Sequence, residues 1–321
     1  MDFKGRTAIV TGGGRGLGLD YARALAGLGA RVVISDLGTD RLGAGADEQV
    51  AVTAARMLQA EGGQVVAHAG DLADEATARQ LVALAVDTFA GVDIIIHNAG
   101  WVGYQGIEDT DREFLSRALD VNVQAPTWLC KHAWPYLKRS GAARVVLTTS
   151  DRAMYQQYAQ PGLLAYAAGK MAQLGIMNAL GMEGREHGIL VNAVSPVAKT
   201  RMWGVTEAPV ELKPEWVTPG VLYLASAACR DSGYVLRASN GQFTATRFSE
   251  NPGVDYPRSL ARVAASSVED VARLWEQIKE GCSSLRTAPR TRAAAVVGPA
   301  AGPRQAAGRY LQPAGPVAGC H

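Results

Sequence analysis

The sequence predicts an α/β protein built on a doubly wound, Rossmann-type parallel sheet of seven strands, with helices on both faces, in a single domain. Three observations predict this fold class. Short apolar segments alternate with helical segments between residues 7 and 194. A glycine-rich turn joins the first apolar segment to the first helical one. Polar residues follow the ends of the later apolar segments, where a parallel sheet gathers its ligand-binding groups.

The first predicted strand covers residues 8–10, and a helix follows over residues 17–28. In the turn between them, Gly12 permits a tight bend, Gly16 lets the backbone approach a pyrophosphate, and Gly18 lets the helix pack against the strand. The helix N-terminus supplies free N–H groups and the positive end of a dipole, so the turn is predicted to bind the phosphates of a dinucleotide. The expected contacts in this turn come from Gly12, Arg15, Gly16, Leu17 and Gly18.

Asp36 ends the second predicted strand, residues 31–36, and lies 18 positions after Gly18. At about this spacing a carboxylate accepts a hydrogen bond from the adenosine ribose and repels a 2′-phosphate, so Asp36 favours NAD over NADP. Arg15 argues for the opposite choice, because a cation in the turn pairs with a 2′-phosphate. We give Asp36 the greater weight, and NADP stays open as the alternative cofactor.

The periodicity of apolar residues predicts the elements that follow. The further strands are expected at residues 64–69, 92–96, 144–149 and 190–194, with short segments at 234–236 and 242–245 as a seventh strand and an extra edge strand. The helices are expected at residues 49–60, 74–90, 111–137, 164–186 and 267–278. Ser267 is the expected N-cap of the last helix. The connection over residues 37–48 is rich in glycine and long for a link between strand and helix.

The charge distribution separates the body of the chain from its end. Five arginines and no acidic residue lie beyond residue 285, within an Ala/Gly/Pro/Arg-rich tail, residues 282–321, that we expect to be disordered. The remaining chain holds 27 basic and 30 acidic residues, which argues against a nucleic-acid partner. The four cysteines lie far apart, so we expect no metal site and a reducing, cytoplasmic location. No segment reads as a secretory signal or a membrane span, so no membrane partner is expected.

Tyr166 and Lys170 lie on one face of the helix predicted over residues 164–186. A tyrosine has an ordinary pKa of about 10, and a nearby cation lowers that pKa by favouring the phenolate. Tyr166 is therefore a candidate acid–base group for an alcohol that loses hydride or a ketone that gains it. Ser150, after the strand at residues 144–149, is expected to hold the substrate oxygen, and Asn122 a water that relays a proton from Lys170.

Taken together, these residues resemble the pattern of the short-chain dehydrogenases/reductases over roughly residues 4–250. The motifs that carry the resemblance are Thr11-Gly12-x-x-x-Gly16-x-Gly18, Asn98-Ala99-Gly100, Asn122, Ser150 and Tyr166-x-x-x-Lys170. The resemblance implies a catalytic tetrad of Asn122, Ser150, Tyr166 and Lys170. It also implies that Tyr166, Lys170, Asn98, Ala99 and Gly100 contact or support the cofactor. Asp71 and Leu72 follow the strand at residues 64–69, where the adenine of a dinucleotide would lie.

Three features depart from the family pattern. His97 replaces the asparagine usual before Asn98, and we interpret it as a packed histidine rather than a catalytic base. The spacing from Ser150 to Tyr166 is longer than usual, which places extra residues in a loop over the substrate, within residues 155–164. Pro196-Val197 stands where the family commonly has Pro-Gly.

A narrower resemblance is to the 3-hydroxyacyl-CoA dehydrogenase unit of the peroxisomal multifunctional β-oxidation enzymes. It is carried by Asp36-Leu37-Gly38 with its long continuation, Arg201-Met202, the segment 212–219 and Ser239-Asn240-Gly241-Gln242. It implies NAD as cofactor and oxidation of a hydroxyl group β to a thioester. Arg152, Lys199 and Arg201 are candidates to meet acidic groups of coenzyme A, with ordinary surface charge as the alternative.

We therefore expect an NAD-dependent oxidoreductase with a catalytic domain at residues 1–281, substrate loops at about 151–164 and 197–220, and a tail at 282–321. The first expected substrate is a 3-hydroxyacyl thioester, and the alternative is a steroid, terpenoid or cyclic alcohol. A further alternative is a regulator that binds NAD without turnover. The resemblance also implies a homodimer or homotetramer, paired through the long helices.

Overall fold

The computed structural model describes residues 1–200 and 210–279 of the chain. The chain divides into two compact units, Met1–Phe248 and Ser249–His321, which we describe separately. The predicted tail at 282–321, and with it part of the predicted substrate loop at 197–220, lies outside the described residues. The residues that the sequence selects for chemistry all belong to the first unit.

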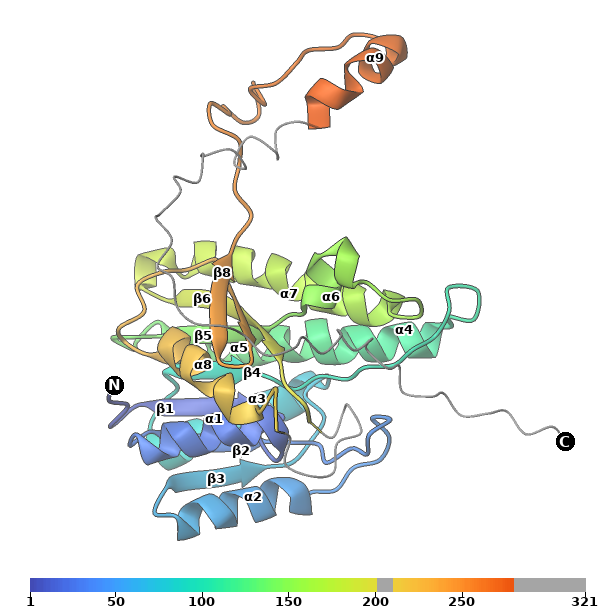
Figure 1. Cartoon of the computed structure of the whole chain (residues 1–321). Coiled ribbons are helices and arrows are strands. Elements are labelled where there is room, and N and C mark those ends of the chain that lie inside the picture. The colour runs from blue at the N-terminus through green and yellow to red at the C-terminus, as the bar shows by residue number, and fades with distance from the viewer. Residues whose placement is uncertain (201–209, 280–321) are drawn as a thin grey trace, which may run out of the picture. The chain divides into compact units, whose positions relative to one another are not determined.

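The first unit is organised around an eight-stranded sheet with the strand order β3-β2-β1-β4-β5-β6-β7-β8 (Figure 1). All neighbouring strands pair in parallel except β7 and β8, which pair antiparallel. The strands are β1 Thr7–Thr11, β2 Arg31–Ser35, β3 Gln64–His68, β4 Ile94–His97, β5 Arg144–Thr148, β6 Leu190–Val197, β7 Val235–Ser239 and β8 Gln242–Thr246. The predicted doubly wound parallel sheet is confirmed, and β8 is the extra edge strand expected near residues 242–245.

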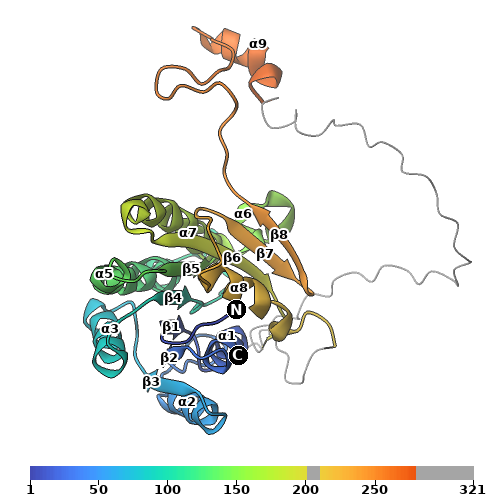
Figure 2. The ribbon, with the colours of Figure 1, turned by 90° about the vertical axis from the view of Figure 1, so that its left-hand side faces the viewer.

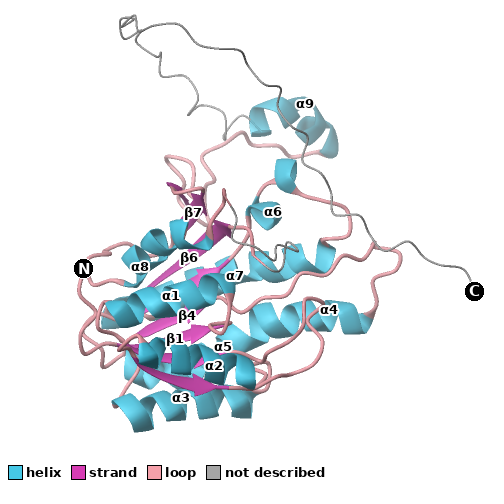
Figure 3. Cartoon of the chain, turned by 60° about the horizontal axis from the view of Figure 1, so that its bottom comes forward, coloured by secondary structure: helices cyan, strands magenta, loops and turns pink. Residues whose placement is uncertain are grey.

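Helices cover both faces of the sheet (Figures 2 and 3). One face carries α1 Gly16–Gly27, α2 Gln49–Ala60 and α8 Thr218–Ala225, and the other carries α3 Glu75–Phe89, α5 Ala125–Leu137 and α7 Leu164–Glu183. Side chains of β1 alternate between two buried clusters: Ala8 and Val10 pack with α1, and Ile9 packs with α3 and α5. The sheet is therefore buried on both faces, as its continuous apolar strands require.

One helix differs from its predicted form. The segment expected as a single helix over residues 111–137 consists of α4 Arg112–Leu119, a π-helical turn Asp120–Gln124 and then α5. Ala125 N–H donates to the carbonyl of Asp120, five residues earlier, which widens the helix by one residue at this point. The periodicity of apolar residues does not reveal such a local change of hydrogen-bond partner. Asn122, a predicted site residue, lies in the middle of this turn and is fully buried.

In the second unit, the described residues contain the helix α9, Val268–Lys279. The N–H of Asp270 donates to the hydroxyl of Ser267 at 3.0 Å, so the predicted N-cap is confirmed. None of the helices within residues 1–200 and 210–279 is long and apolar enough to cross a bilayer.

Candidate active site

The glycine-rich turn connects β1 to α1 in the conformation that its glycines permit. Gly12 and Gly16 adopt φ values of 61° and 54°, in the left-handed region that favours glycine. At Gly18 a Cβ atom would lie 2.1 Å from the carbonyl oxygen of Gly12, so the helix packs against the turn more closely than any side chain allows. The first helical N–H groups therefore lie at the end of β1, where the sequence predicts that a phosphate binds.

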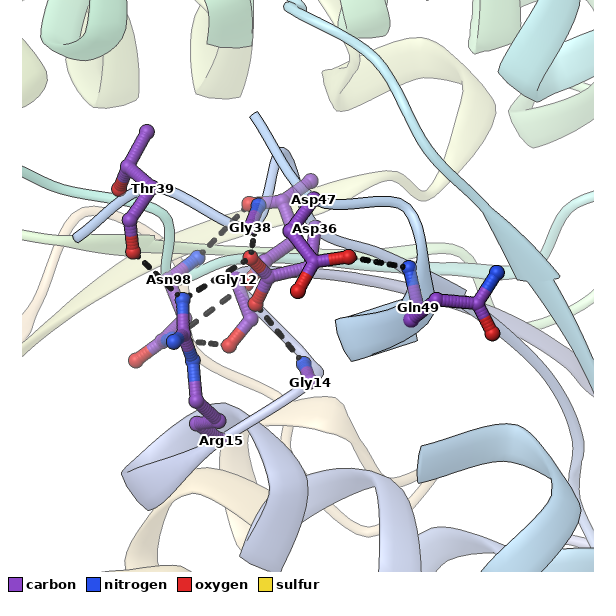
Figure 4. A network of polar contacts seen from close by, with 10 residues as sticks. Gly12, Gly14, Arg15, Asp36, Gly38, Thr39, Asp47, Gln49 and Asn98 are labelled. Carbon is purple, nitrogen blue, oxygen red and sulfur yellow. Dashed lines mark hydrogen bonds and ion pairs between the residues drawn. The ribbon is translucent and has the colours of Figure 1, made fainter. Parts of the chain in front are cut away.

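Asp36 lies just beyond the end of β2 and is hydrogen-bonded to the turn (Figure 4). Its carboxylate accepts from the N–H of Gly14 at 3.0 Å and from the N–H of Gly38 at 2.8 Å. Arg15 Nη2 donates to the carbonyl of Thr39 at 2.8 Å and lies 3.9 Å from Asp36 Oδ1. The carboxylate therefore stands inside the predicted ribose site, and the cation is held beside it by the long loop after β2.

Thr11 joins the turn to the segment after β4. Its hydroxyl oxygen accepts from the N–H groups of Asn98 and Ala99 at 3.1 and 3.0 Å. The side chain of Asn98 donates in turn to the carbonyls of Thr11 and Gly12, each at 3.3 Å. These contacts bring Asn98 and Ala99 against the glycine turn, as predicted for a support of the cofactor site.

His97 is a packed residue with both ring nitrogens engaged. Nδ1 lies 3.1 Å from the hydroxyl of Thr11, and Nε2 lies 3.1 Å from the carbonyl of Val121. Because the Thr11 oxygen already accepts two N–H groups, we assign its proton to Nδ1 and the histidine proton to Nε2. Burial, reinforced by the charge of Lys170, lowers the pKa of His97 to about 3. The imidazole is therefore neutral and structural, as the sequence suggested.

Ser150 and Tyr166 meet where β5 ends against the start of α7. Ser150 caps the short helix α6, Asp151–Met154, and its hydroxyl oxygen accepts from the N–H of Arg152 at 3.2 Å. Burial raises the pKa of Tyr166, while a hydrogen bond from Ser150 and the charge of Arg152 act to lower it. The Ser150 hydroxyl therefore lies close enough to the Tyr166 phenol to interact with it.

Lys170 lies one turn after Tyr166 on α7, and its side chain is buried. Its Nζ lies 6.0 Å from the centre of the Tyr166 ring and donates to the carbonyl of Thr148 at 2.9 Å. We expected Lys170 to lower the pKa of Tyr166; in this structure the lowering comes from Ser150 and Arg152. Burial lowers the pKa of Lys170 itself to about 8, so this amine gains or loses a proton close to neutral pH.

Gly100 lies beside the Lys170 amine, and Asn122 lies against α7, the helix that carries Lys170. A Cβ atom on Gly100 would lie 3.3 Å from Lys170 Nζ, so this glycine leaves room beside the amine. Asn122 Nδ2 donates to the carbonyl of Ala118 at 2.8 Å, and the carbonyl of Asn122 accepts from Gln173 at 2.7 Å. Asn122 Oδ1 is buried without a partner among the described residues, and such an oxygen is suited to accept from a water.

A family model described as short chain dehydrogenase matches residues 6–209. The chain belongs to this family. Membership makes it an oxidoreductase that works with a nicotinamide cofactor, and it is consistent with a small-molecule substrate.

Two kinds of relative stand out among members of the short-chain dehydrogenase family. The chain is 32% identical over 278 residues to a putative short-chain type dehydrogenase/reductase of Mycobacterium tuberculosis, covering 86% of this chain and 94% of the relative. It is 30% identical to the peroxisomal multifunctional enzyme type 2 of Drosophila melanogaster, covering 87% of this chain and 46% of the enzyme. The chain therefore spans less than half of that multifunctional enzyme. The predicted resemblance to such enzymes is confirmed.

The fold agrees with solved members of the family. The crystal structure of a short chain dehydrogenase from Mycobacterium avium matches with a TM-score of 0.73 and 28% identity, over 88% of this chain and 97% of that one. The full-length peroxisomal multifunctional enzyme type 2 from Drosophila melanogaster matches in fold with a TM-score of 0.68.

The residues of this short-chain dehydrogenase fit a dinucleotide. Gly12 and Gly16 adopt positive φ and carry no side chain of their own, and Asp36 lies where a ribose hydroxyl is expected. Asp71 and Leu72 follow the end of β3, beside the strand that leads to Asp36. The Asp71 carboxylate accepts from the N–H of Ala73 at 2.9 Å, and Leu72 is buried. The adenine-side residues therefore share one edge of the sheet with the glycine turn.

The loop between Ser150 and Tyr166 borders a cavity of about 570 Å³. Arg152 and residues 105–109 line it together with residues 159–164, where the sequence placed its extra residues. The N–H of Gln105 donates to the carbonyl of Gly162 at 2.9 Å and ties the two walls. Ser150 and Tyr166 do not contribute to this lining, so the cavity lies beside the reacting groups.

Sequence reasoning missed three polar residues next to Ser150, namely Asp151, Ser195 and Arg237. Ser195 and Arg237 are neighbours in the register of β6 and β7, and both bond to Asp151. Ser195 comes directly after the strand predicted at residues 190–194, and it is one of the polar residues that follow strand ends, but the sequence assigns it no partner. The lone arginine in the otherwise uncharged strand Val235–Ser239 was the available signal, because a cation in a sheet needs an anionic partner.

Proposed function

We propose that this chain is an NAD-dependent oxidoreductase that transfers hydride between nicotinamide and the carbon of a secondary alcohol or ketone. The contact between the Ser150 hydroxyl and the Tyr166 phenol, with Lys170 on the next turn of α7, carries this proposal. Tyr166 supplies the proton-transfer group, Ser150 the group that holds the substrate oxygen, and Lys170 an amine whose pKa of about 8 lies near neutral pH.

In this mechanism Ser150 donates to the substrate oxygen and fixes it beside Tyr166. Tyr166 takes the proton of an alcohol or returns it to a ketone. Because burial raises the pKa of Tyr166, the phenolate needs positive charge nearby, which Arg152 provides and to which an oxidised nicotinamide would add. The proton that Tyr166 takes from an alcohol then passes by way of the Lys170 amine to a water held by Asn122 Oδ1, an acceptor that is unpaired among the described residues. The bound nicotinamide supplies the hydride chemistry.

We propose NAD rather than NADP on the basis of Asp36 and Arg15. One oxygen of the Asp36 carboxylate accepts from Gly14 in the turn and the other from Gly38 in the loop after β2, and a carboxylate there repels a 2′-phosphate. Arg15, the residue that argued for NADP, is engaged by Thr39 and lies within ion-pair distance of Asp36. Gly12, Gly16, Leu17 and Gly18 would hold the pyrophosphate, Asn98, Ala99 and Gly100 would support the nicotinamide side, and Tyr166 and Lys170 would meet its ribose.

The proposed substrate is a 3-hydroxyacyl thioester. The support for the thioester is the relation to the peroxisomal multifunctional enzymes. A hydroxyl group at the 3-position is also supported by a D-beta-hydroxybutyrate dehydrogenase of Rhizobium meliloti, which is 29% identical over 191 residues. We further propose that the protein acts in the cytoplasm as a homodimer or homotetramer. Buried Cys130 and Cys229, both free thiols, agree with a reducing location.

The test is a panel of alcohols followed by NADH absorbance, with NAD and NADP in parallel. The panel contains a 3-hydroxyacyl-CoA, a hydroxysteroid and a cycloalkanol, with Tyr166→Phe as the inactive variant and Tyr136→Phe, on the distant helix α5, as its control. We expect thioester oxidation that is lost in Tyr166→Phe and kept in the control. Good alcohol activity without thioester activity would replace the substrate class. Activity that survives in Tyr166→Phe would refute the mechanism.

A further inference from the structure

The carboxylate of Asp151, directly after Ser150, is held by two strands of the sheet. Arg237 Nε donates to both carboxylate oxygens at 3.0 Å, and its Nη2 donates to Oδ2 at 2.7 Å. The hydroxyl of Ser195 donates to Oδ1 at 2.8 Å. We call Asp151, Ser195 and Arg237 the Asp151 clamp. Four hydrogen bonds converge on one carboxylate, an arrangement with far more specificity than a surface ion pair.

Arg237 also packs against the loop that follows Asp151. Its guanidinium lies 4.7 Å from the centre of the Tyr155 ring and 6.0 Å from that of Tyr158. The two rings meet edge to face with their centres 6.1 Å apart. The clamp therefore holds the loop at Asp151 by charge and at Tyr155 and Tyr158 by cation–π contact.

The segment between these anchors has little stability of its own. Helix α6 has four residues, too few for a helix to form without outside support. Ser150 caps it, and the carbonyl of Ser150 accepts from the N–H groups of Ala153 and Met154 at 3.0 and 3.1 Å. Displacing Asp151 would consequently turn or unwind the helix and move the Ser150 hydroxyl with it.

The clamp is well enough shielded for these bonds to matter. The side chains of Arg237 and Asp151 are 28% and 17% exposed. The register places Ser195 directly opposite Arg237, so the two donors are fixed by the ladder between β6 and β7 rather than by flexible loops. The hydrogen bonds to Asp151 raise the pKa of Arg237 above its ordinary value, so the guanidinium keeps its charge throughout the working pH range.

We propose that Asp151 and Arg237 are positioning residues for the proposed reaction, which hold the Ser150 hydroxyl against the oxygen that Tyr166 protonates. The catalytic role of the clamp rests on the proposed function, whereas its structural role rests on the contacts described above. A displacement of about 1 Å of a catalytic group reduces turnover by up to roughly 100-fold. The clamp lies at β6 and β7, away from the glycine turn after β1, so its loss should spare cofactor binding.

The test compares Arg237→Gln, Arg237→Lys and the double variant Arg237→Gln/Asp151→Asn with Arg23→Gln. The control breaks the Arg23–Glu61 pair, whose atoms lie 3.1 Å apart on the surface between α1 and the end of α2. Three quantities are measured: hydrogen exchange of the segment 150–158, the dissociation constant of NADH, and kcat and KM for the best alcohol of the panel above.

We expect Arg237→Gln to speed exchange in segment 150–158 and to lower kcat by about 10- to 100-fold, with NADH affinity changed by less than about twofold. Arg237→Lys should restore part of kcat, because it keeps the charge but loses the paired hydrogen bonds. The double variant Arg237→Gln/Asp151→Asn should have a kcat no lower than that of Arg237→Gln, because both changes remove the same interaction between Asp151 and Arg237. Arg23→Gln should leave all three quantities unchanged.

Unchanged exchange in Arg237→Gln would overturn the proposal, and so would faster exchange with an unchanged kcat, which would make the clamp purely structural. Should the wild type oxidise none of the alcohols, the proposed function fails. Exchange of segment 150–158 in Arg237→Gln then decides the clamp alone: faster exchange supports it, and unchanged exchange removes it.

Discussion

Replacing Asp36 by asparagine tests the cofactor choice, because it removes one charge and changes few atoms. The carboxylate accepts one backbone N–H on each oxygen, from Gly14 and from Gly38. Asparagine has one acceptor oxygen, so its amide group faces a donor at the other position and one of these bonds is lost. A hydrogen bond to a charged group contributes about 1.5–3 kcal/mol to stability.

The ion pair with Arg15 adds less. At the 3.9 Å between Arg15 Nη2 and Asp36 Oδ1, two charges attract by about 4 kcal/mol at an effective dielectric constant of 20. The Arg15 side chain is 35% exposed, however, and pairs this open to water contribute less than about 1 kcal/mol. We therefore expect Asp36→Asn to lower the free energy of unfolding by about 2–3 kcal/mol, most of it from the lost hydrogen bond.

The effect on cofactor choice is measured by fluorescence titration with NADH and NADPH, which needs no substrate. Removing the carboxylate charge should shift the ratio of the two dissociation constants toward NADPH by about 10-fold or more, equivalent to about 1.4 kcal/mol of relieved repulsion. Arg15→Gln is the matched control, because it removes the cation and leaves Asp36 in place; it should not improve NADPH binding. An unchanged ratio in Asp36→Asn would show that the carboxylate does not select the cofactor.

Two further variants probe the packing around the turn. Gly18→Ala would place Cβ 2.1 Å from the Gly12 carbonyl oxygen, so it should lower the free energy of unfolding by at least about 1–3 kcal/mol and abolish NADH binding. The control is Gly27→Ala on the same helix, where a Cβ would meet no atom within 4 Å; it should leave both thermal stability and NADH binding intact. The folded-state pKa of His97 is lowered to about 3, so His97 contributes stability above its ordinary pKa of 6.5 that is lost as the pH falls toward 3. Between pH 6.5 and pH 4, the free energy of unfolding in urea should therefore fall by about 3 kcal/mol less in His97→Asn than in the wild type. An equal fall in the two proteins would contradict this account.

The alternation of strands and helices, and the residues at strand ends, were readable from sequence because they depend on local chemistry. A parallel sheet buried on both faces requires continuous apolar strands, and a pyrophosphate-binding turn requires glycine. The placement of Ser150 beside Tyr166 followed from the same logic, since the end of β5 and the start of α7 must meet at one edge of the sheet.

Other features depend on pairings between distant segments, which no periodicity records. The clamp joins residue 151 to residue 237, and the loop after β2 reaches Arg15 through the Thr39 carbonyl. The pKa of Tyr166 was expected to fall under the influence of Lys170. In this structure burial dominates and raises that pKa, because the amine is turned toward the Thr148 carbonyl. Spacing along a helix brings two residues near each other without fixing where their polar ends point.

The π-helical turn at Asp120–Gln124 has a consequence for how this region tolerates change in length. The extra residue rotates everything after it by about 100° relative to a regular helix, since each residue advances an α-helix by 1/3.6 of a turn. A deletion of one residue there would restore ordinary α-helical pairing, yet it would turn the buried face of α5, with Leu129 and Ala133, away from the sheet. The same deletion would also swing Asn122 out of line with Gln173. The packing of α5 against the sheet and the position of Asn122, the acceptor for the proposed water, thus both depend on the same inserted residue.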